Sequence, residues 1–356
     1  MKKIVITLLA SILFLVNCSD DSNGDNFDRG PILSNLADAI ILPGYRQLSQ
    51  DLNGLSTAIN TFNSERSIVN LDALKDSWKV ARLSWKSIEL YRFGPIEDRF
   101  LFTKMDIYPV SASGIEEVIS AYDGSANYIV PVASTSRGFG AIEYMLFSDS
   151  EAVTLTSFDD ENRRSYLALV AENLGDNINT VITEWENGYT ETFKAGISND
   201  VGSGITRFTN AMLQHIEDIK NFKVETPLGL RTDSDPIPED VESPYANISA
   251  EMIVTNMNAI ETAFTGGQGQ SLDDYLNELN ASGESGNRLS DDIITKIDEC
   301  RTLAQSIDNL AVAVETGDQT ANNLLVALQE LTTLTKSDMM SQLGLLITFS
   351  STDGDS

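Results

Sequence analysis

The sequence predicts an all-α protein. Apolar residues recur three and four positions apart over long windows, whereas the strict alternation typical of β-strands is rare. The 356 residues are 42% hydrophobic and 22% charged, which suits a folded protein with a buried core rather than a disordered chain. We therefore expect a series of helices that bury their apolar faces against one another.

The first segment of the chain is typical of an export signal. Lys2 and Lys3 precede an apolar run over residues 4–16, which is too short to cross a bilayer as a stable helix but suits the core of a signal peptide. The run ends in Leu15-Val16-Asn17-Cys18, which resembles a bacterial lipobox, where the cysteine becomes the first mature residue and carries acyl chains. We expect residues 1–17 to be a signal peptide and Cys18 to be the lipidation site, so that the protein is held at a membrane.

Residues 18–31 are expected to form a tether. Ser19-Asp20-Asp21-Ser22-Asn23-Gly24-Asp25 is polar, acidic and too poor in apolar side chains to pack. Its position after the cysteine looks like the surface-export signal of Bacteroidetes lipoproteins, and a plain linker is the alternative. The sequence therefore predicts an outer-membrane lipoprotein that faces either the periplasm or the cell surface.

Helices are expected in order along the rest of the chain. The first covers residues 34–62 with a break at Pro43-Gly44, and the next covers 71–88 and ends before Gly94-Pro95, because these residue types interrupt helices. Ser249 and Ser290 are expected N-caps, since an acidic residue follows each in the first turn. The remaining expected helices cover 162–185, 205–222, 249–264, 290–314 and 320–335.

Two stretches lack helical periodicity. Residues 94–137 mix prolines and glycines with apolar pieces, and their length suggests a functional excursion. Residues 228–247 carry three prolines and several acids, which is typical of a connector between domains. We expect an N-terminal helical domain over residues 32–235 and a C-terminal one over 236–356.

Charge and rare residues narrow the function. Acidic residues outnumber basic ones 53 to 24, giving a net charge of −29, so nucleic acid is excluded as a partner. One histidine and two cysteines are too few for clustered zinc, haem or iron–sulfur ligands, so any metal would be held mainly by oxygen. His215 lies on an apolar helical stripe, and we interpret it as a hydrogen-bonded core residue.

A first group of candidate residues lies on one helix. Trp78, Arg82, Trp85 and Glu89 are spaced four, three and four apart, which places two indoles and two opposite charges on one stripe. A buried charge needs an opposite charge, a hydrogen-bond network or a wet cleft. Both a structural ion pair to another helix and a functional site remain open.

A second group supplies more acids. In the helix expected around residues 138–147, Glu143 falls on the same face as Phe139 and Leu146, and Asp106 is surrounded by apolar neighbours. Glu89, Asp106 and Glu143 could converge on a hard cation such as iron or another divalent ion, which accepts oxygen ligands. The alternative is that Glu143 neutralises an arginine, either Arg82 or Arg137.

These residues resemble a known family. Gly138-Phe139-Gly140-Ala141-Ile142-Glu143-Tyr144 is similar to the Gly-x-His-x-x-Glu signature of the imelysin family. The stripe from Trp78 to Glu89 and the run Asp106-Ile107-Tyr108-Pro109 are similar to two further markers, and the resemblance extends from about residue 32 to the end. Weaker matches are Thr226-Pro227-Leu228-Gly229, Val241-Glu242-Ser243-Pro244-Tyr245 and Leu343-Gly344-Leu345-Leu346-Ile347-Thr348-Phe349.

The resemblance implies two helical-bundle-like domains with a site at their interface around the signature. It also implies periplasmic or surface placement, a role in iron uptake with a transporter partner, and an older classification as a peptidase. The ligand-binding residues carried over are Arg82, Glu89, Asp106, Gly138, Gly140 and Glu143.

One departure from the family pattern bears on activity. The family histidine aligns with Gly140, so its pairing with Glu143 is lost. Because a zinc hydrolase needs about three protein ligands and an activated water, this loss argues against peptidase activity. We expect a lipid-anchored, non-catalytic protein that supports cation uptake. The alternatives are a metal-dependent peptidase that uses carboxylate ligands and a scaffold for a partner transporter.

Overall fold

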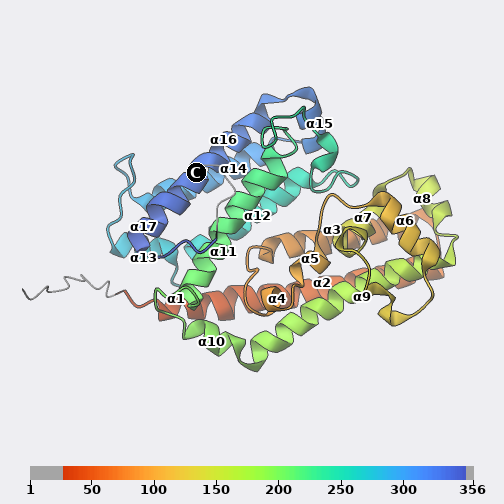
Figure 1. Cartoon of the computed structure of the whole chain (residues 1–356), viewed down its shortest axis with the longest axis horizontal. Helices are drawn as coiled ribbons and strands as arrows, with labels where there is room; N and C mark the ends of the chain where they lie inside the picture. Colours follow the sequence, from red (N-terminus) through yellow and green to blue (C-terminus); the bar gives the residue numbers. More distant parts are fainter. Residues whose placement is uncertain (1–26, 350–356) are drawn as a thin grey trace, which may run out of the picture.

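The computed structural model describes residues 27–349, and within them the chain is a set of packed helices (Figure 1). The described part contains no β-strand, only an isolated bridge between Ser282 and Arg288. The predicted all-α fold is therefore confirmed. None of the described helices combines the length and the low charge needed to cross a bilayer. The predicted signal peptide and Cys18 lie outside the described residues.

A first bundle is built on three long helices. In Figure 1, α2 (Leu42–Ser64), α3 (Ile68–Ile88) and α9 (Glu161–Glu184) run side by side, with α7 (Gly138–Phe147) packed against α3 and α9. α6 (Ala112–Ala121) and α8 (Glu151–Ser157) lie at one end. At the other end, α9 continues through η4 (Trp185–Tyr189) into α10 (Thr190–Lys194).

A second bundle contains α12 (Ser249–Thr265), α14 (Leu289–Gln305) and α16 (Gln319–Thr333), which pack in that order. α11 (Gly204–Asp218) continues into η5 (Ile219–Glu225) and lies against α16. α12 also packs on α3, so it joins the two bundles (Figure 1). The shorter elements are α13 (Leu272–Glu278), α15 (Leu310–Thr316), η7 (Leu334–Met339) and α17 (Met340–Leu343).

The two stretches without periodicity consist of short turns. Residues 94–137 form α4 (Pro95–Asp98), α5 (Phe102–Met105), α6, η2 (Ala126–Ile129) and η3 (Ser134–Ser136), and residues 228–247 contain only η6 (Pro238–Asp240). Both stretches deliver acids to the same place in the molecule, as described below. The predicted domain boundary after residue 235 stays a prediction, although α11 lies before it and packs with the second bundle.

Three local predictions are wrong. The helix does not break at Pro43, because the π-helical turn η1 (Leu36–Ile41), which follows α1 (Gly30–Asn35), places the proline in the first turn of α2, where its missing N–H is tolerated. Neither Ser249 nor Ser290 is an N-cap; Ser249 bonds with Ser243 instead. The expected helix 290–314 is interrupted after Gln305.

The end of the predicted tether is folded. Phe27 stacks on Tyr275 with ring centroids 4.3 Å apart, and the buried guanidinium of Arg29 donates to the Tyr275 hydroxyl. α1 begins at Gly30. Residues 27–31 therefore belong to the helical body, which corrects the tether's predicted end at residue 31.

Candidate functional site

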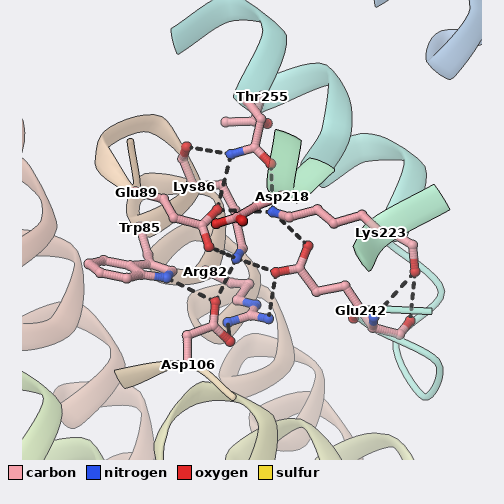
Figure 2. Close-up of polar contacts among 12 residues, drawn as sticks. Arg82, Trp85, Lys86, Glu89, Asp106, Asp218, Lys223, Glu242 and Thr255 are labelled. Carbon is pink, nitrogen blue, oxygen red and sulfur yellow. Dashed lines mark hydrogen bonds and ion pairs between the residues drawn. The ribbon is translucent and has the colours of Figure 1, made fainter. Parts of the chain in front are cut away.

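Three carboxylates converge on the ammonium group of Lys86, on the last turn of α3 (Figure 2). Its Nζ lies 2.9 Å from Glu89 Oε1 and 2.5 Å from Asp106 Oδ2, and it also contacts Glu242 Oε1. One oxygen of each acid lies within 4.8 Å of the other two, which is the spacing of a metal-binding group. The Lys86 ammonium therefore occupies the position that a metal ion would need.

Two further cations complete this buried network. The Arg82 guanidinium contacts Asp106 Oδ1 and lies 3.6 Å from Glu242 Oε1. Lys223 Nζ, from η5, lies 3.0 Å from Glu89 Oε2 and 3.0 Å from Glu242 Oε2. All three cations and all three acids are buried, so their formal charges cancel within the protein interior.

Neutral donors fill the remaining positions of the network. Trp85 Nε1 donates to Asp106 Oδ2 at 2.9 Å. Asn256 on α12 donates to the Lys86 carbonyl at 2.9 Å and to Glu89 Oε2 at 3.2 Å, and its own oxygen accepts from Lys223 at 2.8 Å. Buried ion pairs are stable only when such hydrogen bonds satisfy the remaining polar groups.

The network keeps its acids ionised. Burial alone would raise the pKa of Glu89, but Lys223 and Lys86 hold that pKa well below its usual value. Burial likewise opposes ionisation of Asp106, yet Arg82 and Lys86 lower its pKa. The predicted charges on the Trp78–Glu89 stripe therefore have partners on other segments, which supports the structural ion-pair interpretation of Arg82 and Glu89.

Glu143 has a different role from the other acids. Its Oε1 accepts hydrogen bonds from the backbone N–H groups of Tyr245 and Ala246, each at 3.0 Å. Burial raises the pKa of Glu143, although Arg82 and these N–H groups oppose the rise. The structure thus brings Glu89 and Asp106 together as expected, but Glu242 takes the third position. Glu143 fixes the turn that carries Glu242, and Arg137 donates to the Ile129 carbonyl instead of pairing with Glu143.

The two glycines of the signature are tightly packed. Gly138 has φ +76°, and a Cβ there would lie 2.3 Å from the Met105 carbonyl oxygen. A Cβ at Gly140 would lie 2.4 Å from Val110 Cγ1 and 3.3 Å from the Ile107 carbonyl oxygen. Val110 therefore fills the space that a side chain at position 140 would need, and the backbone of the 94–137 excursion closes over α7.

A pocket of about 280 Å³ lies beside the network. Glu89, Asp106 and Lys223 contribute to its lining, and its apolar walls include Phe102 and Phe222. Arg92 and Asp218 also line it; they form an ion pair, and the guanidinium carbon of Arg92 lies 4.4 Å from the centroid of the Phe102 ring. The predicted acids therefore border an open space as well as the buried cations.

His215 also lines this pocket, and its prediction needs correction. The side chain is fully buried, as expected, but neither ring nitrogen has a hydrogen-bond partner. Burial lowers the pKa of His215 well below its usual value, although Glu89 opposes the shift. The imidazole is therefore neutral at physiological pH, with a free lone pair.

Comparison with known proteins identifies the family. The model of the imelysin family matches residues 41–337. The chain belongs to the imelysin family. A solved imelysin-like protein from Psychrobacter arcticum superposes with a TM-score of 0.74 at 20% identity, and the match covers 90% of this chain and 97% of that one.

Two other relatives carry an iron-related name. A structure described as an iron-regulated protein A precursor, from Parabacteroides distasonis, superposes with a TM-score of 0.73 at 21% identity over 90% of this chain and 97% of that one. Iron-regulated protein A of Synechococcus elongatus is 22% identical over 206 residues, which cover 55% of this chain. The match spans only 54% of that curated relative. At these identities the structural likeness shows the fold alone.

Sequence analysis missed three members of the network. Lys86 lies four residues after Arg82 and three before Glu89, so the helical spacing that singled out those two also includes it. Glu242 lies inside a motif already noted for its family resemblance, but no role was assigned to it. Lys223 follows Phe222 at the end of an apolar stripe, and nothing in its local sequence indicates burial.

Proposed function

We propose that this protein is a lipid-anchored imelysin-family protein of the outer membrane that binds iron or another divalent cation for uptake, without catalysis. Cys18 holds it to the membrane, and the body faces the periplasm or the cell surface. A transporter partner receives the cation. The iron-related names of two family relatives support the choice of cation.

The observation that carries this proposal is the charge of the 280 Å³ pocket. Its lining holds two basic side chains, Arg92 and Lys223, and four acidic ones, Glu89, Asp106, Asp218 and Asp240. With all six ionised, the lining has two negative charges in excess. A divalent cation would neutralise that excess in a space large enough for an ion that keeps some of its water.

The residues do not fit a hydrolytic metal centre. A catalytic zinc needs about three protein ligands and an open position for water. In the carboxylate group, the Lys86 ammonium takes the metal position, and at the signature helix Gly140 offers no ligand while Val110 fills the space. These observations support a binding role over the peptidase alternative.

Cation binding can be tested with the purified full-length protein by calorimetric titration with Fe²⁺ under anaerobic conditions, and with Mn²⁺ and Ca²⁺. We expect saturable binding of one ion, weakened in Asp240→Asn, which removes a charge from the pocket. Asp235→Asn is the matched control, because Asp235 is exposed and does not line the pocket. Absence of binding by every cation, or chelator-sensitive cleavage of a peptide library, would overturn the proposal.

Anchoring has its own test. In a bacterial host that acylates lipoproteins, the wild-type chain is expected to incorporate labelled fatty acid and to fractionate with the outer membrane. Cys18→Ser should abolish both. Cys300→Ser is the control, because Cys300 is fully buried in α14. Equal labelling of wild type and Cys18→Ser would refute lipid attachment at this residue.

A further inference from the structure

The pocket contains a polar side chain with no function in the fold. His215 is fully buried, and both of its ring nitrogens lack a partner. Buried polar groups in native proteins are nearly always hydrogen-bonded, and an exception needs an explanation such as a missing ion. Because His215 lines the 280 Å³ pocket, its unpartnered ring borders an open space.

Two carboxylates accompany the imidazole. Asp218 lies three residues after His215 on α11, so both side chains share one face of the helix, and both line the pocket. Asp218 is held by Gln214, which donates to Oδ1 at 2.8 Å, and by the Arg92 guanidinium. Glu89 lines the pocket from the end of α3 and interacts electrostatically with His215.

We propose that His215 is a ligand for a first-row divalent transition metal ion in this pocket, with Asp218 and Glu89 as the carboxylates beside it. This inference rests on the proposed cation-binding function and deepens it by naming the metal class and the ligand. A neutral imidazole suits Fe²⁺, Zn²⁺ and their neighbours, whereas Ca²⁺ and Mg²⁺ prefer oxygen ligands alone. The site is separate from the signature position, where Gly140 offers no imidazole.

The route to this site passes the Arg92–Asp218 ion pair. A larger groove of about 1010 Å³ adjoins the pocket, and Arg92, Phe102 and Asp218 line both. These three side chains therefore stand between the outer groove and His215. An ion that binds Asp218 competes with Arg92 for the carboxylate, so metal entry requires no movement of a helix.

The single histidine of the chain makes a direct test possible. Full-length protein without a polyhistidine tag, labelled with ¹⁵N only at histidine, gives the ring-nitrogen signals of His215 alone. We expect one equivalent of Zn²⁺ to shift one ring nitrogen as coordination replaces its free lone pair, and Ca²⁺ to leave both unchanged. Unchanged ring signals at saturating Zn²⁺ would overturn the proposal.

Affinity measurements with Fe²⁺ separate this inference from the proposed function. His215→Gln and Asp218→Asn are each expected to weaken binding at least about tenfold, since even outer-shell changes at metal sites cost that much. Glu217→Gln is the matched control for Asp218, because Glu217 is on the same helix but pairs with Lys336 away from the pocket. Thermal melts confirm that each variant is folded.

The outcomes are distinct. If wild type and His215→Gln bind Fe²⁺ equally, the role of His215 is refuted while cation binding stands. If wild type binds no cation, both proposals fail. Should His215→Gln not fold, the ¹⁵N titration of the wild type alone decides.

Discussion

The central position of Lys86 makes a quantitative prediction. Lys86→Met removes the ammonium and keeps a side chain of similar length, so Glu89, Asp106 and Glu242 lose the cation that all three contact. Removing one partner of a buried ion pair costs about 3–5 kcal/mol, because it leaves an uncompensated buried charge. That is a large fraction of a typical unfolding free energy of about 5–15 kcal/mol.

A matched control lies on the same helix. Lys79 Nζ is 2.6 Å from Glu251 Oε2, but the two side chains are 41% and 45% exposed. An exposed pair of this kind contributes about 0–1 kcal/mol. Urea denaturation of wild type, Lys86→Met and Lys79→Met gives the comparison directly, provided that the dependence on urea concentration is unchanged.

The pH dependence of Lys86→Met adds a second check. With the ammonium gone, one of the buried acids should take up a proton in the folded state, which raises its pKa above the unfolded value. The variant's deficit should then shrink as pH falls from 8 to 6. A deficit within about 1 kcal/mol of that of Lys79→Met, and independent of pH, would show that the network does not work as described.

Three more predictions follow from the same region. In the presence of a chelator, the lowered pKa of His215 means that the unfolded state binds a proton near pH 6.5 while the folded state does not, so the unfolding free energy should fall between pH 6.5 and 5 by up to about 1.4 kcal/mol per pH unit; urea titrations of His215→Gln should lack this slope. Gly140→His should lower stability by about 1–3 kcal/mol through collision with Val110 and should gain no peptidase activity, whereas a stable, active variant would contradict the packing argument. Lys86→Ala should be stabilised by millimolar Ca²⁺ in thermal melts, because the vacated position is surrounded by three carboxylates, and an equal response of the wild type would count against this.

Helical periodicity predicted most of the fold, because an apolar stripe reports directly on the face that is buried. The spacing of Trp78 and Trp85 placed α3 correctly, and both indoles are fully buried. Periodicity says nothing about how a backbone absorbs an irregular residue. A π-helical turn before Pro43 kept the chain helical where the sequence favoured a break.

The candidate site was predictable only where its members share one helix. Arg82 and Glu89 stand out because they interrupt an apolar stripe, and Lys86 meets the same criterion. Glu242 and Lys223 come from a connector and a helix end more than 130 residues further on, as their bonds to α3 show. Their burial depends on how the two bundles meet, which local spacing does not encode. His215 was placed in the core correctly, but its missing hydrogen bonds are visible only in three dimensions.

The charged network also constrains how the two bundles can move. Lys86 on α3 contacts Glu242 in the connector, and Asn256 on α12 donates to the Lys86 carbonyl. Any hinge opening between the bundles would separate these groups and expose ions to one another's unscreened fields before water could enter. A clamshell closure around cargo is therefore disfavoured, and loading and release should depend on rotamer changes at the pocket mouth, on a timescale set by side chains rather than by domains.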